Sequence, residues 1–150
     1  MRSEFRGNLE DSWPTATAAI AAMRILVADD DLSTAIRTIL EQAGFKHVDA
    51  VTCGRDALVR HARQPYDLLV LNRRMPPIGA LEALQHLRAA GDGVPVIVTA
   101  AGEIDEKALL TLGVWDLVPK PFCSRDLVDS TIQALGVEQY RRSVDGARTH

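Results

Sequence analysis

Three consecutive aspartates, Asp29, Asp30 and Asp31, directly follow a short apolar run. Adjacent carboxylates repel each other unless a cation lies between them, and Mg²⁺ prefers such hard oxygen ligands. The first two aspartates therefore predict a divalent-cation site. Asp31 fits a different role, because aspartate is a favoured N-cap residue and a helical pattern follows it.

Further polar residues stand where other apolar runs end. Asn72 follows the third run, Thr99 ends the fourth, and Lys120 comes shortly after the fifth. A single polar residue in such a place is usually only the start of a solvated loop. Four of them become informative when the fold brings the ends of the runs together.

Five apolar runs alternate with segments that have helical spacing, which predicts an α/β fold with a parallel sheet and helices on both faces. In the first helical segment, apolar residues recur from Leu32 to Ala43, and Gly44 can end the helix. Such a sheet places function at the carboxyl ends of its strands. The runs are Ile25–Ala28, His47–Val51, Leu68–Leu71, Val96–Thr99 and Trp115–Val118.

The composition fits one ordinary globular domain: 150 residues, of which 47% are hydrophobic and 25% charged. A net charge of −3 provides no positive field for nucleic acid or an anionic membrane, and no apolar run is long enough to cross a bilayer. Two cysteines, Cys53 and Cys123, form neither a metal motif nor a disulfide framework. These features favour the cytoplasm.

The ends of the chain do not follow the strand–helix pattern. We expect residues 1–22 to be a flexible N-terminal extension or a remnant of an expression vector, and residues 23–136 to form the domain. Residues 137–150 would be a tail or linker, or an extension of the last helix. The last segment is too short for a DNA-binding domain. We therefore expect no direct binding to nucleic acid from this chain, and any output domain to lie outside it.

The order and spacing of four segments resemble the receiver domain of two-component response regulators. The resemblance covers Arg24 to about Gly136. It implies a flavodoxin-like, doubly wound sheet with strand order 2-1-3-4-5, and a role in phosphorelay signal transduction without enzymatic activity. The matching segments are 25–31 (ILVADDD), 69–76 (LVLNRRMP), 95–100 (PVIVTA) and 120–122 (KPF).

The resemblance assigns roles to the residues at the strand ends. It implies Mg²⁺ held by Asp30, by Asp29 largely through water, and by the backbone carbonyl of Arg74, with position 72 beside the ion. Lys120 and Thr99 would contact oxygens of a phosphoryl group. Both residues also have an ordinary structural explanation. A lysine before proline is often part of a surface turn, and a threonine that ends a strand is often there because it favours strands.

Position 72 departs from the family, which has a phosphate-accepting aspartate there. A neutral carboxamide offers no anionic oxygen as nucleophile, so we predict that Asn72 is not phosphorylated. The lost charge also predicts weakened Mg²⁺ binding. Two explanations stay open: a natural atypical receiver, or an engineered phospho-null substitution in an ordinary one.

Two smaller departures concern the loop after the third strand and the output face. Ala80 stands where the family usually has glycine, and Leu117 where many members carry an aromatic residue that reports phosphorylation.

The resemblance also implies partners: a sensor histidine kinase or another signalling protein, and a second copy in a homodimer through the fourth helix, fifth strand and fifth helix. That face would carry Glu103, Glu106, Lys107, Trp115, Leu117 and Arg125.

Two other classes of function fit the same architecture. A Mg²⁺-dependent phosphotransferase or hydrolase would use the cluster Asp29–Asp31, but the sequence has no Gly-rich phosphate loop. A flavin-binding module would need aromatic residues near the strand ends, where the chain has few.

Overall fold

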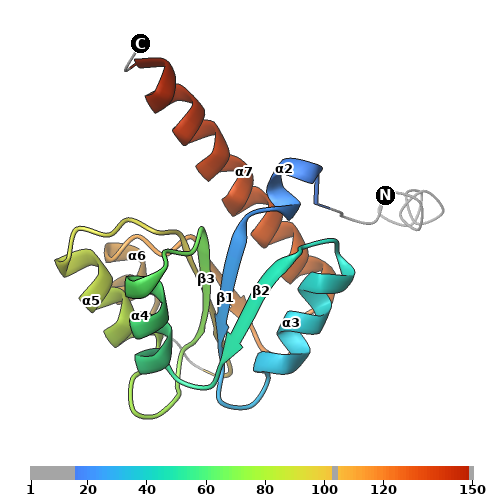
Figure 1. Ribbon diagram of the computed structural model, residues 1–150. Coiled ribbons are helices and arrows are strands. Elements are labelled where there is room, and N and C mark those ends of the chain that lie inside the picture. Colours follow the sequence, from blue (N-terminus) through green and yellow to red (C-terminus); the bar gives the residue numbers. More distant parts are fainter. Residues whose placement is uncertain (1–15, 103–104, 149–150) are drawn as a thin grey trace.

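Five parallel strands in the order β2-β1-β3-β4-β5 form the centre of the molecule (Figure 1). This computed structural model describes residues 16–102 and 105–148. The doubly wound fold and its strand order are as predicted. The strands are β1 (Arg24–Ala28), β2 (His47–Val51), β3 (Leu68–Asn72), β4 (Val96–Ala100) and β5 (Asp116–Pro119), and the helices are α2 (Ala18–Ala21), α3 (Ser33–Gln42), α4 (Gly54–Arg63), α5 (Ala80–Ala89), α6 (Glu106–Thr111) and α7 (Ser124–Arg148).

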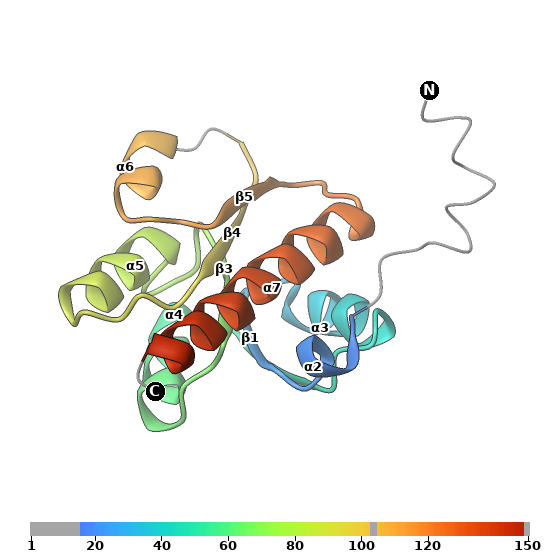
Figure 2. The same cartoon turned by 90° about the horizontal axis from the view of Figure 1, so that it is seen from above.

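Helices cover both faces of the sheet and create two separate cores. α3 and α7 lie on one face, and α4, α5 and α6 lie on the other (Figures 1 and 2). Side chains alternate along β1, so Ile25 and Val27 join the first core while Leu26 and Ala28 join the second. Burial on both faces explains why these strands are continuous apolar runs and not alternating ones.

The first helix ends as the sequence predicts. α3 stops at Gln42, and Gly44 has φ = 106°, a left-handed conformation that glycine adopts without strain. Ile36 and Leu40 on this helix are fully buried against the sheet. The apolar stripe and the terminal glycine together define the helix.

Part of the segment that we expected to lie outside the domain packs into it. Ile20 and Ala21 of α2 are buried, Lys46 N donates to Ala21 O (3.0 Å), and Ala16 N donates to Ala43 O (3.2 Å). The domain therefore begins before Met23, because this apolar segment buries surface against α7. Residues 1–15 of the expected extension lie outside the described residues.

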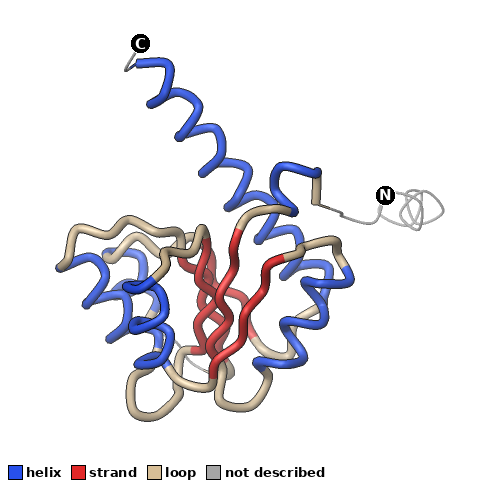
Figure 3. Tube along the Cα trace, in the orientation of Figure 1, coloured by secondary structure: helices blue, strands red, loops and turns tan. Residues whose placement is uncertain are grey.

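Of the alternatives for the segment after Gly136, the structure has the helix extension, because α7 continues through it. The helix has 25 residues, passes Gly136 without a break and extends beyond the body of the domain (Figures 1, 2 and 3). Gly136 faces α2, and a Cβ there would lie 3.9 Å from Ile20 Cδ1. Despite the length of α7, none of the helices in the described residues is apolar enough to cross a membrane.

Candidate functional site

The carboxyl edge of the sheet brings together the polar residues picked out from the sequence. Asp29 follows β1, Asn72 ends β3, and Thr99 pairs with Asn72 in the register of β3 and β4. Lys120 follows β5 and donates to both Asp29 and Asn72. The predicted convergence of strand ends is therefore present, and Lys120 is its centre.

Asp29 is fully buried and bonded at both carboxylate oxygens. Oδ1 accepts from the backbone N–H groups of Asp31 (2.8 Å) and Leu32 (2.9 Å), and Oδ2 accepts from Lys120 Nζ (2.8 Å). Burial alone would raise the pKa of Asp29, but the hydrogen bonds from Lys120, Leu32 and Asp31 outweigh it, so the pKa falls below its ordinary value. Asp29 and Lys120 form a buried ion pair.

The side chain of Asn72 is nearly buried and uses both ends of its amide. Oδ1 accepts from Lys120 Nζ (3.3 Å). Nδ2 donates to Asp30 Oδ1 (3.2 Å) and to the backbone carbonyl of Arg74 (2.9 Å). One amide thus links the residues that follow β1, β3 and β5.

The hydroxyl of Thr99 does not take part in this hydrogen-bond network. Thr99 is fully buried, and within the described residues its Oγ1 has no hydrogen-bond partner. A buried hydroxyl without a partner is costly, which makes Thr99 the one unsatisfied member of the predicted site. The Thr99 hydroxyl is therefore free to donate a hydrogen bond.

The predicted N-cap role of Asp31 is wrong. α3 begins at Ser33 after Leu32, which makes no capping hydrogen bond, and Asp31 is exposed. The carboxylate of Asp29 already accepts the N–H groups of Asp31 and Leu32 at this turn. These two N–H groups precede the helix, so Asp29 holds the turn that leads into α3, and the helix itself begins without a side-chain cap.

Sequence reasoning missed the tight packing of the loop after β3. A side chain on Gly79 would overlap the carbonyl oxygen of Arg73, so glycine is required at Gly79 and not at the next residue, Ala80. A hollow of about 310 Å³ lies beside this loop, lined by Arg73, Arg74, Met75, Gly79, Leu81 and Glu82.

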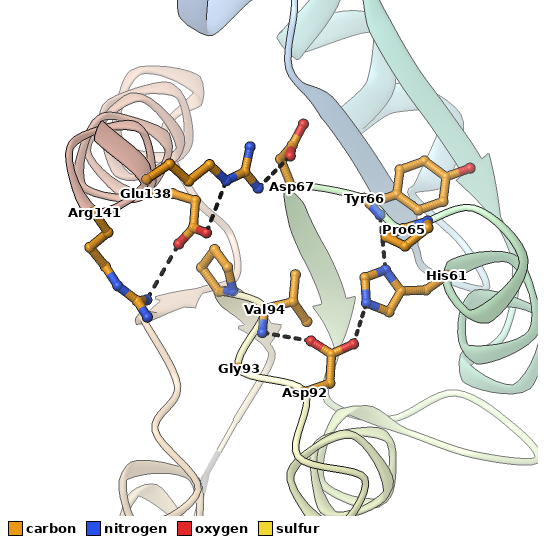
Figure 4. Close-up of a pocket in the computed structure, with 11 residues that line it drawn as sticks. His61, Pro65, Tyr66, Asp67, Asp92, Gly93, Val94, Glu138 and Arg141 are labelled. Atoms are coloured by element: carbon orange, nitrogen blue, oxygen red, sulfur yellow. Dashed lines mark hydrogen bonds and ion pairs between the residues drawn. The ribbon is translucent and has the colours of Figure 1, made fainter. Parts of the chain in front are cut away.

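A larger hollow, of about 400 Å³, lies at the opposite, amino edge of the sheet (Figure 4). His61 Nδ1 accepts from Tyr66 N (3.0 Å), so Nε2 carries the proton and donates to Asp92 Oδ2 (2.7 Å). Asp67 accepts from Arg24 N (2.6 Å) and from Arg142 of α7 (2.7 Å). Here the polar groups are engaged with one another and with the backbone.

Comparison with known proteins identifies the family to which this strand-end cluster belongs. The profile of the response regulator receiver domain matches residues 25–132. The chain belongs to that family. Receiver domains are generally signalling modules without enzymatic activity in two-component systems, and they generally bind Mg²⁺ at an acidic pocket.

Curated relatives of this receiver domain are longer proteins. It is 38% identical over 117 residues to response regulator MprA of Mycobacterium leprae, covering 75% of this chain and 50% of that protein. It is 35% identical over 108 residues to the transcriptional regulatory protein CpxR homolog of Haemophilus influenzae, covering 70% of this chain and 47% of that protein. The chain thus spans about half the length of these relatives.

Solved structures share the fold. The signal receiver domain of the putative Luxo repressor protein from Vibrio parahaemolyticus has a TM-score of 0.76 at 21% identity, covering 82% of this chain and 97% of that one. Response regulator StyR has a TM-score of 0.74 at 28% identity, covering 85% and 67%.

The residues expected to hold Mg²⁺ do not fit the ion as they are arranged in this receiver domain. Asp30 Oδ1 and the Arg74 carbonyl both accept from the amide nitrogen of Asn72, a group that cannot lie beside a cation. Both oxygens of Asp29 are also engaged. Within residues 16–102 and 105–148, no group of three or more His, Cys, Asp or Glu side chains is placed to hold a metal ion.

Proposed function

We propose that this receiver domain acts through protein–protein contacts and is not phosphorylated at Asn72. The supporting observation is the amide itself: its oxygen accepts from Lys120 and its nitrogen donates to Asp30 and Arg74. An acyl phosphate forms by attack of an anionic carboxylate oxygen, and an amide oxygen carries no such charge. The neighbouring residues resemble phosphotransfer machinery whose acceptor has been replaced.

The same substitution weakens Mg²⁺ binding. Asp29, Asp30, Asn72 and Lys120 together carry one net negative charge, and an aspartate at position 72 would make it two. The cation also competes with the amide nitrogen for the oxygens of Asp30 and Arg74. We therefore expect Mg²⁺ to bind poorly, because it would have to displace the Asn72 nitrogen from the oxygens of Asp30 and Arg74.

Partners are a sensor histidine kinase or another signalling protein, and a second copy through α6, β5 and α7. On this face Leu110 is 62% exposed and Trp115 is 37% exposed, which suits a protein contact. Leu117 is half-buried in β5 and packs against the second core, in keeping with a structural role. Glu103, also assigned to this face, lies outside the described residues.

We place any output domain outside these 150 residues, since the chain spans about half the length of its curated relatives. We assign the domain to the cytoplasm. Because its net charge is −3, we expect no direct contact with nucleic acid or membrane. A transcriptional output fits the name of one relative, the CpxR homolog. The phosphotransferase or hydrolase alternative is not favoured, because the Asp29 carboxylate is held by Lys120 and backbone N–H groups.

The deciding experiment is incubation with Mg²⁺ and acetyl phosphate, followed by intact mass measurement. The protein with Asn72 should gain no labile phosphoryl group, and a gain at this residue would refute the proposal. The Asn72→Asp variant is the matched control. If only the variant gains phosphate, the pocket is competent and an engineered substitution is favoured; if neither does, a natural atypical receiver is favoured.

A further inference from the structure

We propose that the amide group of Asn72 replaces the divalent cation as the tie at the carboxyl edge of the sheet, so that the loop after β3 is ordered without metal. The inference rests on the proposed function, in which Asn72 stands at the acceptor position. It goes further by giving the substituted residue a structural task. The amide nitrogen takes over the two oxygens that the resemblance gives to Mg²⁺.

The orientation of the amide is fixed by its partners. Lys120 Nζ can only donate, so the atom of Asn72 that faces it is the oxygen. The carbonyl of Arg74 can only accept, so the atom that faces it is the nitrogen. Turning the amide over would place its nitrogen against the Lys120 ammonium, donor against donor. It would also place its oxygen against the oxygens of Asp30 and Arg74, acceptor against acceptor, so the contacts allow only one orientation.

Charge favours the amide over the cation at this place. The carboxylate of Asp29 is already neutralised by Lys120, at 2.8 Å. Asp30 is exposed to solvent and accepts the amide N–H, which satisfies one of its oxygens without a second positive charge. A carboxylate at position 72 would instead stand next to Asp30 with no donor between them, the arrangement that calls for a cation.

The loop after β3 receives its order from this tie and from backbone contacts. Arg73 N donates to Thr99 O (2.8 Å), Ala80 N donates to Arg73 O (3.2 Å), and Gly79 fits against the same carbonyl. The Asn72 amide adds the side-chain bond to the Arg74 carbonyl, at 2.9 Å. Each contact is made within the chain, so the loop does not depend on a bound ion.

The test compares thermal unfolding of the whole chain in EDTA and in millimolar MgCl₂, for three proteins: the chain as it is, Asn72→Asp and Asn72→Ala. We expect the unfolding temperature of the unchanged chain to move by less than about 1 °C between the two conditions. Asn72→Asp should lose about 3–8 °C in EDTA and recover most of it with Mg²⁺. Asn72→Ala should lose a similar amount in EDTA, because it removes the tie.

Hydrogen exchange of backbone amides in residues 73–79 provides a second readout that needs no variant to fold. In the unchanged chain, exchange of this loop should be equally slow with EDTA and with Mg²⁺. If Mg²⁺ slows it several-fold, or raises the unfolding temperature as much as in Asn72→Asp, the amide is not the tie and the inference is overturned. Phosphorylation of the unchanged chain would instead refute the proposed function, so the two failures are distinguishable.

Discussion

The two edges of the sheet use polar side chains in opposite ways. At the carboxyl edge, Lys120 joins the side chains of Asp29 and Asn72, and Thr99 keeps an unpaired hydroxyl. At the amino edge, the guanidinium of Arg88 donates to backbone carbonyls of Leu112, Asp92, Val94 and Gly113. The first edge places side chains relative to one another, whereas the second fastens loops to the sheet.

The size of a hollow therefore does not indicate where the functional site of this molecule lies. The hollow at the amino edge (Figure 4) is the larger of the two described, yet its acids are held in place by His61, the backbone N–H of Arg24, and Arg142. At the carboxyl edge, a buried carboxylate with a lowered pKa lies near an unpaired hydroxyl. Perturbed titration together with an unsatisfied donor is the better sign of a functional site.

Loss of the buried carboxylate should produce the largest effect. Asp29→Ala leaves Lys120, which is 16% exposed, without its anion and frees two backbone N–H groups, so we expect a loss of about 3–5 kcal/mol in the free energy of unfolding. Urea denaturation measures it. Asp31→Ala is the matched control and should change stability by less than about 0.5 kcal/mol. Equal losses in both variants would show that Asp29 has no special place.

At the amino edge, Arg88→Met tests the fastening of the loops. The variant keeps much of the apolar stem but leaves carbonyls of two loops without their donor, and we expect a loss of about 2 kcal/mol in the same assay. Arg63→Met removes an exposed arginine from the end of α4 and should be nearly neutral. If Arg88→Met cost more than Asp29→Ala, the order of importance of the two edges would be reversed.

Removal of the contact between α7 and the amino edge should have a smaller effect. The side chain of Arg142 is 54% exposed, so Arg142→Ala should cost at most about 1 kcal/mol of global stability. Backbone amides of residues 138–145 should nevertheless exchange faster, because Asp67 no longer holds the helix. Arg141→Ala, which loses only a contact with Glu138, serves as the control. Unchanged exchange in Arg142→Ala would mean that the ion pair does not anchor α7.

The smallest effect is spectroscopic and concerns Tyr66 at the amino edge. Burial raises its pKa, and so does Asp49, whose carboxylate accepts from the Tyr66 hydroxyl at 2.6 Å. Because the neutral phenol is favoured in the folded state, its stabilising effect is complete below pH 10 and is lost as the pH rises through the raised pKa. In the Tyr140→Phe background, absorbance at alkaline pH should show late ionisation, and Asp49→Asn should bring it earlier. Ionisation at the pH of free tyrosine would contradict the burial argument.

The apolar runs predicted five strands, because continuous apolar runs are typical of a parallel sheet buried on both faces, and the resemblance to receiver domains implied their order. β3 extends one residue further, to Asn72, and β5 starts one residue later, at Asp116, than the runs suggested. The meeting of Asp29, Asn72 and Lys120 also followed from the topology, since the carboxyl ends of parallel strands share one edge.

Contacts that depend on packing could not be predicted. The Asn72 nitrogen faces Asp30 and Arg74 because the Asn72 oxygen accepts from Lys120. The sequence contains no signal for this orientation of the amide. The start of α3 at Ser33 likewise depends on the turn that Asp29 holds through the N–H groups of Asp31 and Leu32, which leaves Asp31 outside the capping position. The continuation of α7 involves Arg142 and Asp67, which are 75 residues apart.

The long C-terminal helix has a mechanical consequence. Twelve residues of α7 follow Gly136, and at 1.5 Å per residue they form an arm of about 18 Å. A tilt of about 10° at its base would displace the far end by about 3 Å, nearly one residue of extended chain. A protein that contacted the far end of α7 would therefore meet a larger displacement than one that contacted the helix at Gly136, and the ion pair between Arg142 and Asp67 is the contact that would oppose such a tilt.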